Sequence, residues 1–123
     1  MIRALLLALA VLGTGATTTQ QQTTEASGAV LRALDRMSGE TTDLEIPSGT
    51  AQTYGKLVVS VEDCRFPTGN PAGNAYAHVT ITSANPAAGQ APLFSGWMVA
   101  SSPALNALDD PRYDVWVLRC ITS

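Results

Sequence analysis

The side chains that could act in catalysis are few and far apart in this chain of 123 residues. His78 is the only histidine, and the alternating stretch around it predicts that its side chain points outward from a strand. A Ser-His-acid triad needs a nucleophile beside an imidazole, and the segment Phe94-Ser95-Gly96-Trp97 is not the Gly-x-Ser-x-Gly turn that exposes such a serine. A Ser-x-x-Lys motif is absent because Thr53 stands three residues before Lys56, the only lysine. The sequence therefore predicts no nucleophilic centre.

Two adjacent acidic pairs, Glu62-Asp63 and Asp109-Asp110, are the remaining candidates for acid–base chemistry, as in glycoside hydrolysis. The first lies in a predicted strand, where neighbouring side chains point to opposite faces, so the two carboxylates would not act together. The second precedes Pro111 and is better explained as a helix end followed by a turn. The chain contains no metal-ligand spacing and no glycine-rich phosphate loop. We therefore expect a protein that is not an enzyme and that binds no metal or cofactor.

Cys64 and Cys120 are the only cysteines, so a single intramolecular pairing is available. Each ends a predicted strand, and pairing is the default once a chain reaches an oxidising compartment. The bond would close a loop of about 57 residues and tie an early strand to the last one. A redox role is disfavoured because no Cys-x-x-Cys motif is present, and two cysteines with one histidine are too few for a zinc site. We predict a Cys64–Cys120 disulfide.

The N-terminal segment has the three parts of a secretory signal peptide. Met1–Arg3 is a short positive start, Ala4–Leu12 is an unbroken apolar run, and small residues follow before a cleavage site. A transmembrane anchor is the disfavoured alternative, because the apolar run has about ten residues where a bilayer needs about 20. We predict a signal peptide over residues 1–16, and therefore a periplasmic location. Thr17–Gly28 has no large apolar residue and is predicted to be a flexible polar leader, followed by a single disulfide-closed β domain over residues 29–123.

The charge of the chain excludes one large class of partner. Without the predicted signal peptide, six basic side chains stand against ten acidic ones, and no stretch groups the basic residues into a patch. This balance would repel a phosphate backbone and an anionic lipid surface. We therefore expect no nucleic-acid partner, and membrane contact only through a partner protein.

Short runs of alternating or β-branched residues indicate a mainly β domain. We predict strands at Ala29–Arg36, Thr41–Ile46, Ala51–Tyr54, Lys56–Cys64, Ala75–Ser83, Leu93–Ala100 and Tyr113–Ile121. The first two are expected to form a β-hairpin, with one or two helical turns over Ala29–Asp35 as the alternative. Ser102 is a capping residue and Pro103 fits the first turn of a helix, which predicts one short helix over Ala104–Leu108 near the C-terminus. The fold class is then a small β-sandwich or a partly open barrel.

The last predicted strand and the aromatic residues lie close together in the sequence. The strand is apolar on both faces, with Val115 and Val117 on one and Trp116, Leu118 and Cys120 on the other. Such a strand is typical of the middle of a sheet or of the space between two layers. Trp97, Tyr113 and Trp116 lie near the small-residue loop Asn85–Pro92 and could line a groove for a partner or a sugar. The alternative is that both tryptophans belong to the core, where Trp is buried on average.

The block FSGWMVASSPALNALDDPRYDVWVLRC over Phe94–Cys120 resembles a family of small exported proteins from alphaproteobacteria that carries only a domain-of-unknown-function label. Leu31–Gly49 is similar to that family's opening hairpin, and Tyr54–Cys64 to its central strand and first cysteine. The loop Pro67–Asn74 departs from the family, in which a more acidic segment rich in Pro and Glu is expected. The resemblance implies an envelope location and pairing of the two cysteines, and it implies no activity. It also implies a gene neighbourhood, since members tend to be encoded beside an accessory subunit of respiratory complex I.

These observations lead to the hypothesis of a periplasmic, non-enzymatic interaction domain that is an accessory or structural component of an envelope or respiratory membrane complex. The expected partner is an envelope protein, with an inner-membrane respiratory complex as a candidate. The candidate interaction surface comprises Phe94, Trp97, Met98, Leu105, Leu108 and Tyr113. The alternative hypothesis is a small-ligand or glycan-binding module that uses Trp97 and Tyr113.

Overall fold

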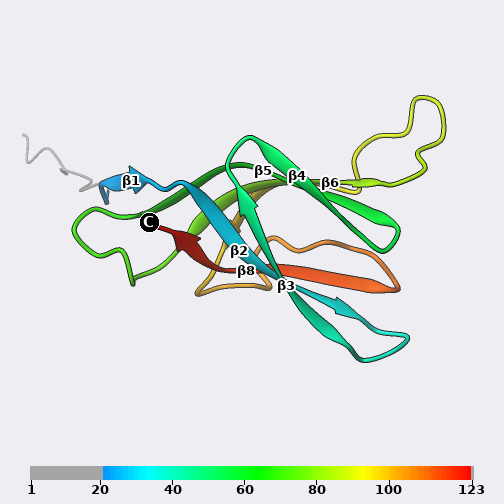
Figure 1. Cartoon of the computed structure of the whole chain (residues 1–123), viewed down its shortest axis with the longest axis horizontal. Coiled ribbons are helices and arrows are strands. Elements are labelled where there is room, and N and C mark those ends of the chain that lie inside the picture. The colour runs from blue at the N-terminus through cyan, green and yellow to red at the C-terminus, as the bar shows by residue number, and fades with distance from the viewer. Residues whose placement is uncertain (1–20, 123) are drawn as a thin grey trace, which may run out of the picture.

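Eight strands build the part of the chain that the computed structural model describes, residues 21–122. They are β1 Thr23–Glu25, β2 Gly28–Asp35, β3 Thr41–Pro47, β4 Thr50–Tyr54, β5 Leu57–Pro67, β6 Tyr76–Ser83, β7 Phe94–Val99 and β8 Tyr113–Ile121. All pairings are antiparallel, and they form two sheets, β3-β2-β8 and β1-β5-β6-β7, with β4 also paired to β5 (Figure 1). The predicted mainly β fold class is confirmed. The predicted signal peptide lies outside the described residues.

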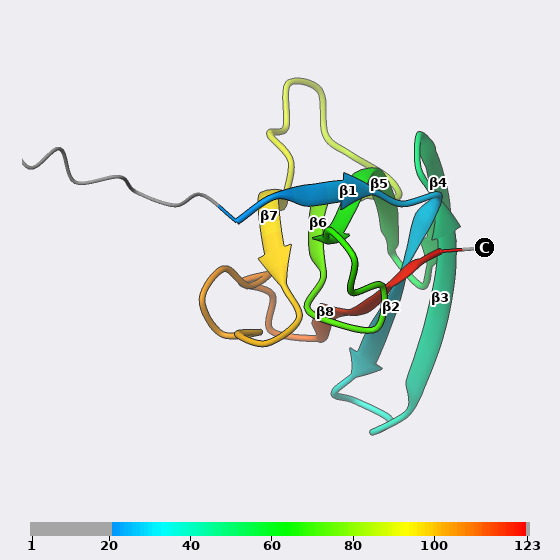
Figure 2. The same cartoon turned by 90° about the vertical axis from the view of Figure 1, so that its left-hand side faces the viewer.

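The core lies between the two sheets, which face each other in Figure 2. Its members on β5 and β6 are the predicted inward residues Leu57, Val59, Val61, Ala77, Val79 and Ile81, each at most 2% exposed. Leu31 of β2, Leu44 of β3 and Val115 of β8 belong to the same cluster. Alternation with a period of two therefore places one apolar face of each sheet inward, and β-branched residues suit such a pleated surface.

The two sheets are joined at one side and open at the other. The chain passes from β3 to β4 through a turn in which Gly49 has a positive φ of 83° and donates to the carbonyl of Val61. On the opposite side β7 and β8 do not pair, and the connection over residues 100–112 lies between them (Figure 2). The structure is therefore a sandwich of two antiparallel sheets and not a closed barrel.

The disulfide predicted from the cysteine count is present and joins the two sheets. Cys64 on β5 and Cys120 on β8 are both buried, and their Cα atoms are 5.8 Å apart. β5 and β8 belong to different sheets and form no backbone pairing with each other. The disulfide therefore stabilises the sandwich by resisting separation of the two sheets.

A β-bulge near the end of β8 corrects the predicted side-chain pattern of this strand. Val30 pairs with Arg119 while Leu31 pairs with Val117, so Leu118 is an extra residue in β8. The extra residue shifts the alternation by one position. Cys120 therefore lies on the core side with Val117, and the prediction that it shares a face with Leu118 is wrong.

The predicted helix over Ala104–Leu108 is also wrong. Among the described residues this segment contains no helix, and its one turn closes through a hydrogen bond from the amide of Leu105 to the carbonyl of Ser102. Five residues allow little more than one helical turn, which gains few hydrogen bonds for the entropy it costs. Burial of Leu108 in the core and a hydrogen bond from Asn106 Nδ2 to the carbonyl of Trp97 hold the segment in an irregular path.

Three further predictions concern β8, β2 and the segment before β2. β8 is an edge strand that pairs with β2, rather than the middle strand of its sheet. The helical alternative for Ala29–Asp35 is wrong, because β2 pairs with β3 on one side and β8 on the other. The structure also differs from the expected flexible leader at Thr23–Glu25, which pairs with β5 through its backbone and so needs no apolar side chain.

Removing the disulfide is expected to lower the free energy of unfolding by about 4 kcal/mol, since chain-entropy models give that value for cysteines 56 residues apart. The measurement is urea unfolding of the Cys64→Ala/Cys120→Ala double variant against the oxidised wild type. Chemically reduced wild type is the control, and it should unfold at nearly the same urea concentration as the double variant. A loss below about 1 kcal/mol would show that the two sheets hold together without the bond.

Candidate functional site

The six residues predicted to form an interaction surface do not lie on one surface. Four of them are core residues that are at most 8% exposed: Phe94, Met98, Leu108 and Tyr113. Trp97 and Leu105 are exposed, by 43% and 75%. Trp97 is therefore exposed, although tryptophan is usually a core residue. The prediction that these six residues form one interaction surface is wrong.

Tyr113 is buried and joins the two sheets. Its hydroxyl oxygen accepts a hydrogen bond from the amide of Lys56 at 3.3 Å, and its ring meets the ring of Tyr54 edge-on at 5.6 Å. Gly55 lies directly against it, because a Cβ at this position would be 2.5 Å from the Tyr113 hydroxyl. The role of Tyr113 is therefore to hold the β4–β5 turn against the start of β8.

Trp97 belongs to a row of three polar or aromatic side chains across the outer face of the larger sheet. Its ring meets the ring of His78 edge-on, with centroids 5.2 Å apart. The Nδ1 atom of His78 lies 3.1 Å from Glu62 Oε2. His78 is thus engaged by a carboxylate and an indole, and among the described residues no serine or cysteine forms a hydrogen bond with it. An exposed indole beside polar groups is an arrangement that can bind a ligand.

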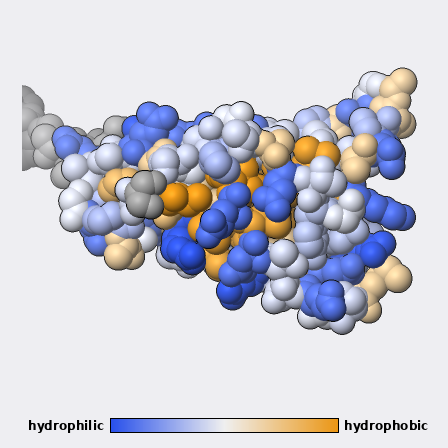
Figure 3. Space-filling view, viewed as in Figure 1, coloured by the Kyte–Doolittle hydropathy of each residue, from blue (hydrophilic) through white to orange (hydrophobic). Residues whose placement is uncertain are grey.

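The outer face of the β3-β2-β8 sheet combines half-buried apolar side chains with charged ones. The apolar residues come from β2 and β8 and are Leu34, Trp116, Leu118 and Ile121. Val30 is only 3% exposed although it lies outside the core cluster, so side chains on this outer face cover it. Figure 3 shows apolar residues gathered over β2 and β8, with charged side chains lying across them. We call the outer face of this sheet, including these five apolar residues and the charged side chains around them, the β2–β8 face.

Ion pairs hold most of the charged groups on the β2–β8 face. Arg32 donates to both carboxylate oxygens of Asp43, at 2.8 and 3.2 Å, and these hydrogen bonds lower the pKa of Asp43 below its usual value. Arg36 lies 3.8 Å from Asp114. Arg119 is exposed and has no ion-pair partner within the part of the chain that the structure describes. It is therefore the cation of this face that remains available to a partner.

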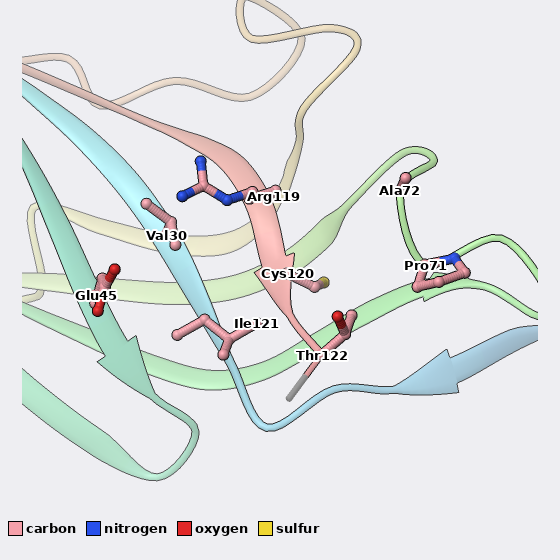
Figure 4. Close-up of a pocket in the computed structure, with 8 residues that line it drawn as sticks. All are labelled: Val30, Glu45, Pro71, Ala72, Arg119, Cys120, Ile121 and Thr122. Atoms are coloured by element: carbon pink, nitrogen blue, oxygen red, sulfur yellow. The ribbon is translucent and has the colours of Figure 1, made fainter.

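A hollow of about 500 Å³ lies at the C-terminal end of β8 (Figure 4). It is lined by Val30, Glu45, Pro71, Ala72, Arg119, Cys120, Ile121 and Thr122. In Figure 4, the loop that carries Pro71 and Ala72 forms one wall and β8 forms the other.

A second hollow, of about 370 Å³, lies at the N-terminal end of the same strand. Its lining is mostly apolar and consists of Arg36, Pro103, Ala104, Ala107, Leu108, Asp114 and Trp116. Residues 103–108 form one wall of this hollow. Of the residues predicted to form the interaction surface, only Leu108 lines it. The half-buried indole of Trp116 stands opposite it and offers an apolar surface with one polar N–H group.

Sequence reasoning missed Leu34, Leu118, Arg119 and Ile121 as candidate site residues. The signal was available in the last strand, which is apolar on both faces. We interpreted that pattern as a strand covered on both sides, whereas an edge strand with one uncovered apolar face produces the same sequence.

Metal-binding clusters and membrane-spanning helices are both absent from the described residues. Within residues 21–122, no three His, Cys, Asp or Glu side chains are grouped so that they could hold a metal ion. The same part of the chain has no helix that is long and apolar enough to cross a bilayer.

The fold and the face together define a class of protein, a small two-sheet β domain with one inter-sheet disulfide and an uncovered, partly apolar sheet face. The chain belongs to a family described as an uncharacterized protein conserved in bacteria (DUF2155), which it matches over residues 29–120. No curated protein and no solved structure matches it. The match includes both cysteines and all of β3 to β7, so the domain described above is the family's domain.

Replacing Gly55 by alanine is expected to cost more stability than the same change at Gly39. Both glycines have a positive φ, which costs alanine about 1 kcal/mol. Only at Gly55 does the new methyl group also overlap Tyr113, whereas nothing lies within 4 Å of it at Gly39. Urea unfolding should show roughly 1–3 kcal/mol of extra loss for Gly55→Ala. Equal losses would mean that Tyr113 does not hold this turn.

Proposed function

We propose that this protein is a non-enzymatic interaction domain of the bacterial envelope, and that it docks a partner protein on the β2–β8 face. The observation that carries the proposal is that Trp116, Leu118 and Ile121 remain partly exposed on a sheet face against which no other strand of the described chain packs. Contiguous exposed apolar surface with a polar surround is typical of protein interaction sites.

The contrast with the other edge of the same sheet supports this proposal. β3 carries Asp43 and Glu45 on its outer face and ends at Pro47, which lacks an amide donor. Charges and proline on an edge strand prevent unwanted pairing. The β8 edge also carries two charges, Asp114 and Arg119, but it has no proline and leaves Trp116, Leu118 and Ile121 partly exposed between and beside them, so it is the less protected of the two edges.

The disulfide and the sequence support the proposed compartment and the proposed kind of partner. A buried disulfide is consistent with an oxidising, exported location, as expected from the predicted signal peptide. The partner is an envelope protein, and the gene neighbourhood implied by the family resemblance favours an inner-membrane respiratory complex, for which this domain would be an accessory or structural component. The excess of acidic side chains disfavours direct contact with nucleic acid or anionic lipid.

A photo-reactive amino acid placed at Leu118 is expected to crosslink a specific envelope protein in intact cells, because this side chain lies at the middle of the β2–β8 face. The measurement is mass spectrometry of the crosslinked product. The same amino acid at Thr82, which is outward-facing on β6 of the opposite sheet, is the matched control and should capture no such protein. Adding Leu118→Glu to a chain labelled at Trp116 should abolish the product. A product from Thr82 alone would place the docking surface on the other sheet.

A second candidate function, a glycan-binding module, is favoured by one observation. Trp97 is the one tryptophan of the chain exposed by more than a third, and His78 and Glu62 beside it supply polar groups. An exposed indole face with neighbouring donors and acceptors can bind a sugar ring. Tyr113, which the original hypothesis paired with Trp97, is buried and takes no part.

The glycan hypothesis predicts that an oligosaccharide changes the fluorescence of Trp97. The measurement is a titration of the Trp116→Phe variant, in which Trp97 is the only fluorophore of its kind, with an N-acetylglucosamine trimer. A saturating change below about 1 mM is expected. The Trp97→Phe variant, with Trp116 retained, is the control and should not respond. An unchanged signal from Trp97 would remove this candidate.

A further inference from the structure

The free edge of β8 lies between the two hollows described above. β8 pairs with β2 along one edge, and no other strand of the described residues pairs with it. No strand of the described residues uses the backbone N–H and C=O groups on its second edge, and residues 103–108 border that edge only at its N-terminal end, beside Asp114 and Trp116. One hollow includes Asp114 and Trp116 of β8, and the other includes Arg119 and Ile121. From Asp114 to Ile121 an extended chain covers about 23 Å, or seven residues of strand.

We propose that an extended segment of the partner adds to the free edge of β8 as a further strand, with an apolar side chain in the hollow beside Trp116 and a carboxylate beside Arg119. The inference rests on the proposed docking face and names what that face recognises. Strand addition obtains affinity from backbone hydrogen bonds and specificity from pockets for particular side chains. The β8 edge offers both, since each end of the strand has its own hollow and the two hollows differ in chemistry.

The charges on the β2–β8 face determine which end of the segment is acidic. Arg32 and Arg36 already have carboxylate partners in Asp43 and Asp114, whereas Arg119 forms no ion pair among the described residues and acts on Asp43 only at longer range. Glu45 also lines the hollow of Arg119, but it pairs with Val30 from the far side of β2 and so lies two strands away from Arg119. A carboxylate arriving at the outer edge of β8 meets the guanidinium of Arg119 first.

The apolar end of the segment is determined by the hollow of Trp116. Its walls carry Pro103, Ala104, Ala107 and Leu108, and the ion pair of Arg36 with Asp114 leaves no unpaired charge at its rim. An apolar side chain is favoured there because it displaces water from apolar surface without separating a charge from its partner.

The test uses the full chain, purified in its oxidised form, and a synthetic probe. The probe is a blocked peptide of about eight residues, alternating Val and Thr, with Leu at one end and Glu at the other. The reversed peptide is included because a strand can add in either direction. On binding, amide hydrogen exchange should slow for residues of β8 and stay unchanged for β7, the free edge of the other sheet.

Two sets of modified molecules identify the contacts. In an added strand, alternate peptide amides point toward β8 and the intervening ones point away. N-methylation of the amides that face β8 should weaken binding at least about tenfold, and N-methylation of the intervening amides should leave binding unchanged. The Arg119→Glu variant should bind the Glu-ended probe about tenfold more weakly and should prefer a probe with Lys in that position. The control is Lys56→Glu, which makes the same charge change at an exposed residue of the β4–β5 turn that forms no ion pair among the described residues and lies off the β2–β8 face, and it should alter neither preference.

Equal binding of both N-methylated sets would overturn strand addition and leave the docking face intact, because the partner would then be held by side chains alone. Strand addition is likewise overturned if no probe protects β8 although the crosslinker at Leu118 captures a partner. If the crosslinker also captures nothing, the docking face itself is wrong.

Discussion

The disulfide and the β-bulge at Leu118 act as a single constraint on this structure. In a regular strand, every second residue after Tyr113 would point inward, which would bury Arg119 and expose Cys120. The extra residue reverses both outcomes, so Cys120 reaches Cys64 between the sheets and Arg119 stays in solvent. An unpaired guanidinium is very costly to bury. The bulge therefore has two effects: it keeps Arg119 in solvent and it allows the disulfide to form.

The same bulge shapes the surface that we propose as the docking face. It turns two consecutive residues, Leu118 and Arg119, away from the core, so an apolar group and a free cation stand together on an edge strand. Bulges commonly re-aim side chains at sheet edges in this way. The open side of the sandwich between β7 and β8 then leaves this edge without a neighbouring strand. Stability and recognition therefore depend on the same few residues of β8.

Local patterns predicted the elements well and their surroundings poorly. The alternation in Leu57–Cys64 and Ala77–Ile81 correctly gave the buried face of both strands, because a strand with one covered face must be apolar at every second position. The cap-and-proline signal at Ser102 and Pro103 failed, since contacts of Leu108 and Asn106 with the sheets outweigh the weak preference of so short a helix. Thr23–Glu25 became a strand through backbone pairing with β5 and through hydrogen bonds of the Thr23 and Thr24 hydroxyls, which composition does not reveal.

The sequence by itself determined the mainly β class, the strand positions and the pairing of the only two cysteines, because these depend on local periodicity and on composition. Only the tertiary structure decided that β8 is an edge strand, which of its faces is uncovered and where the two hollows lie. An edge strand and a central strand can share one apolar pattern, and a bulge appears only in the register with the neighbouring strand. The candidate site, built from that register and from loops far apart in the chain, was therefore beyond the reach of sequence reasoning.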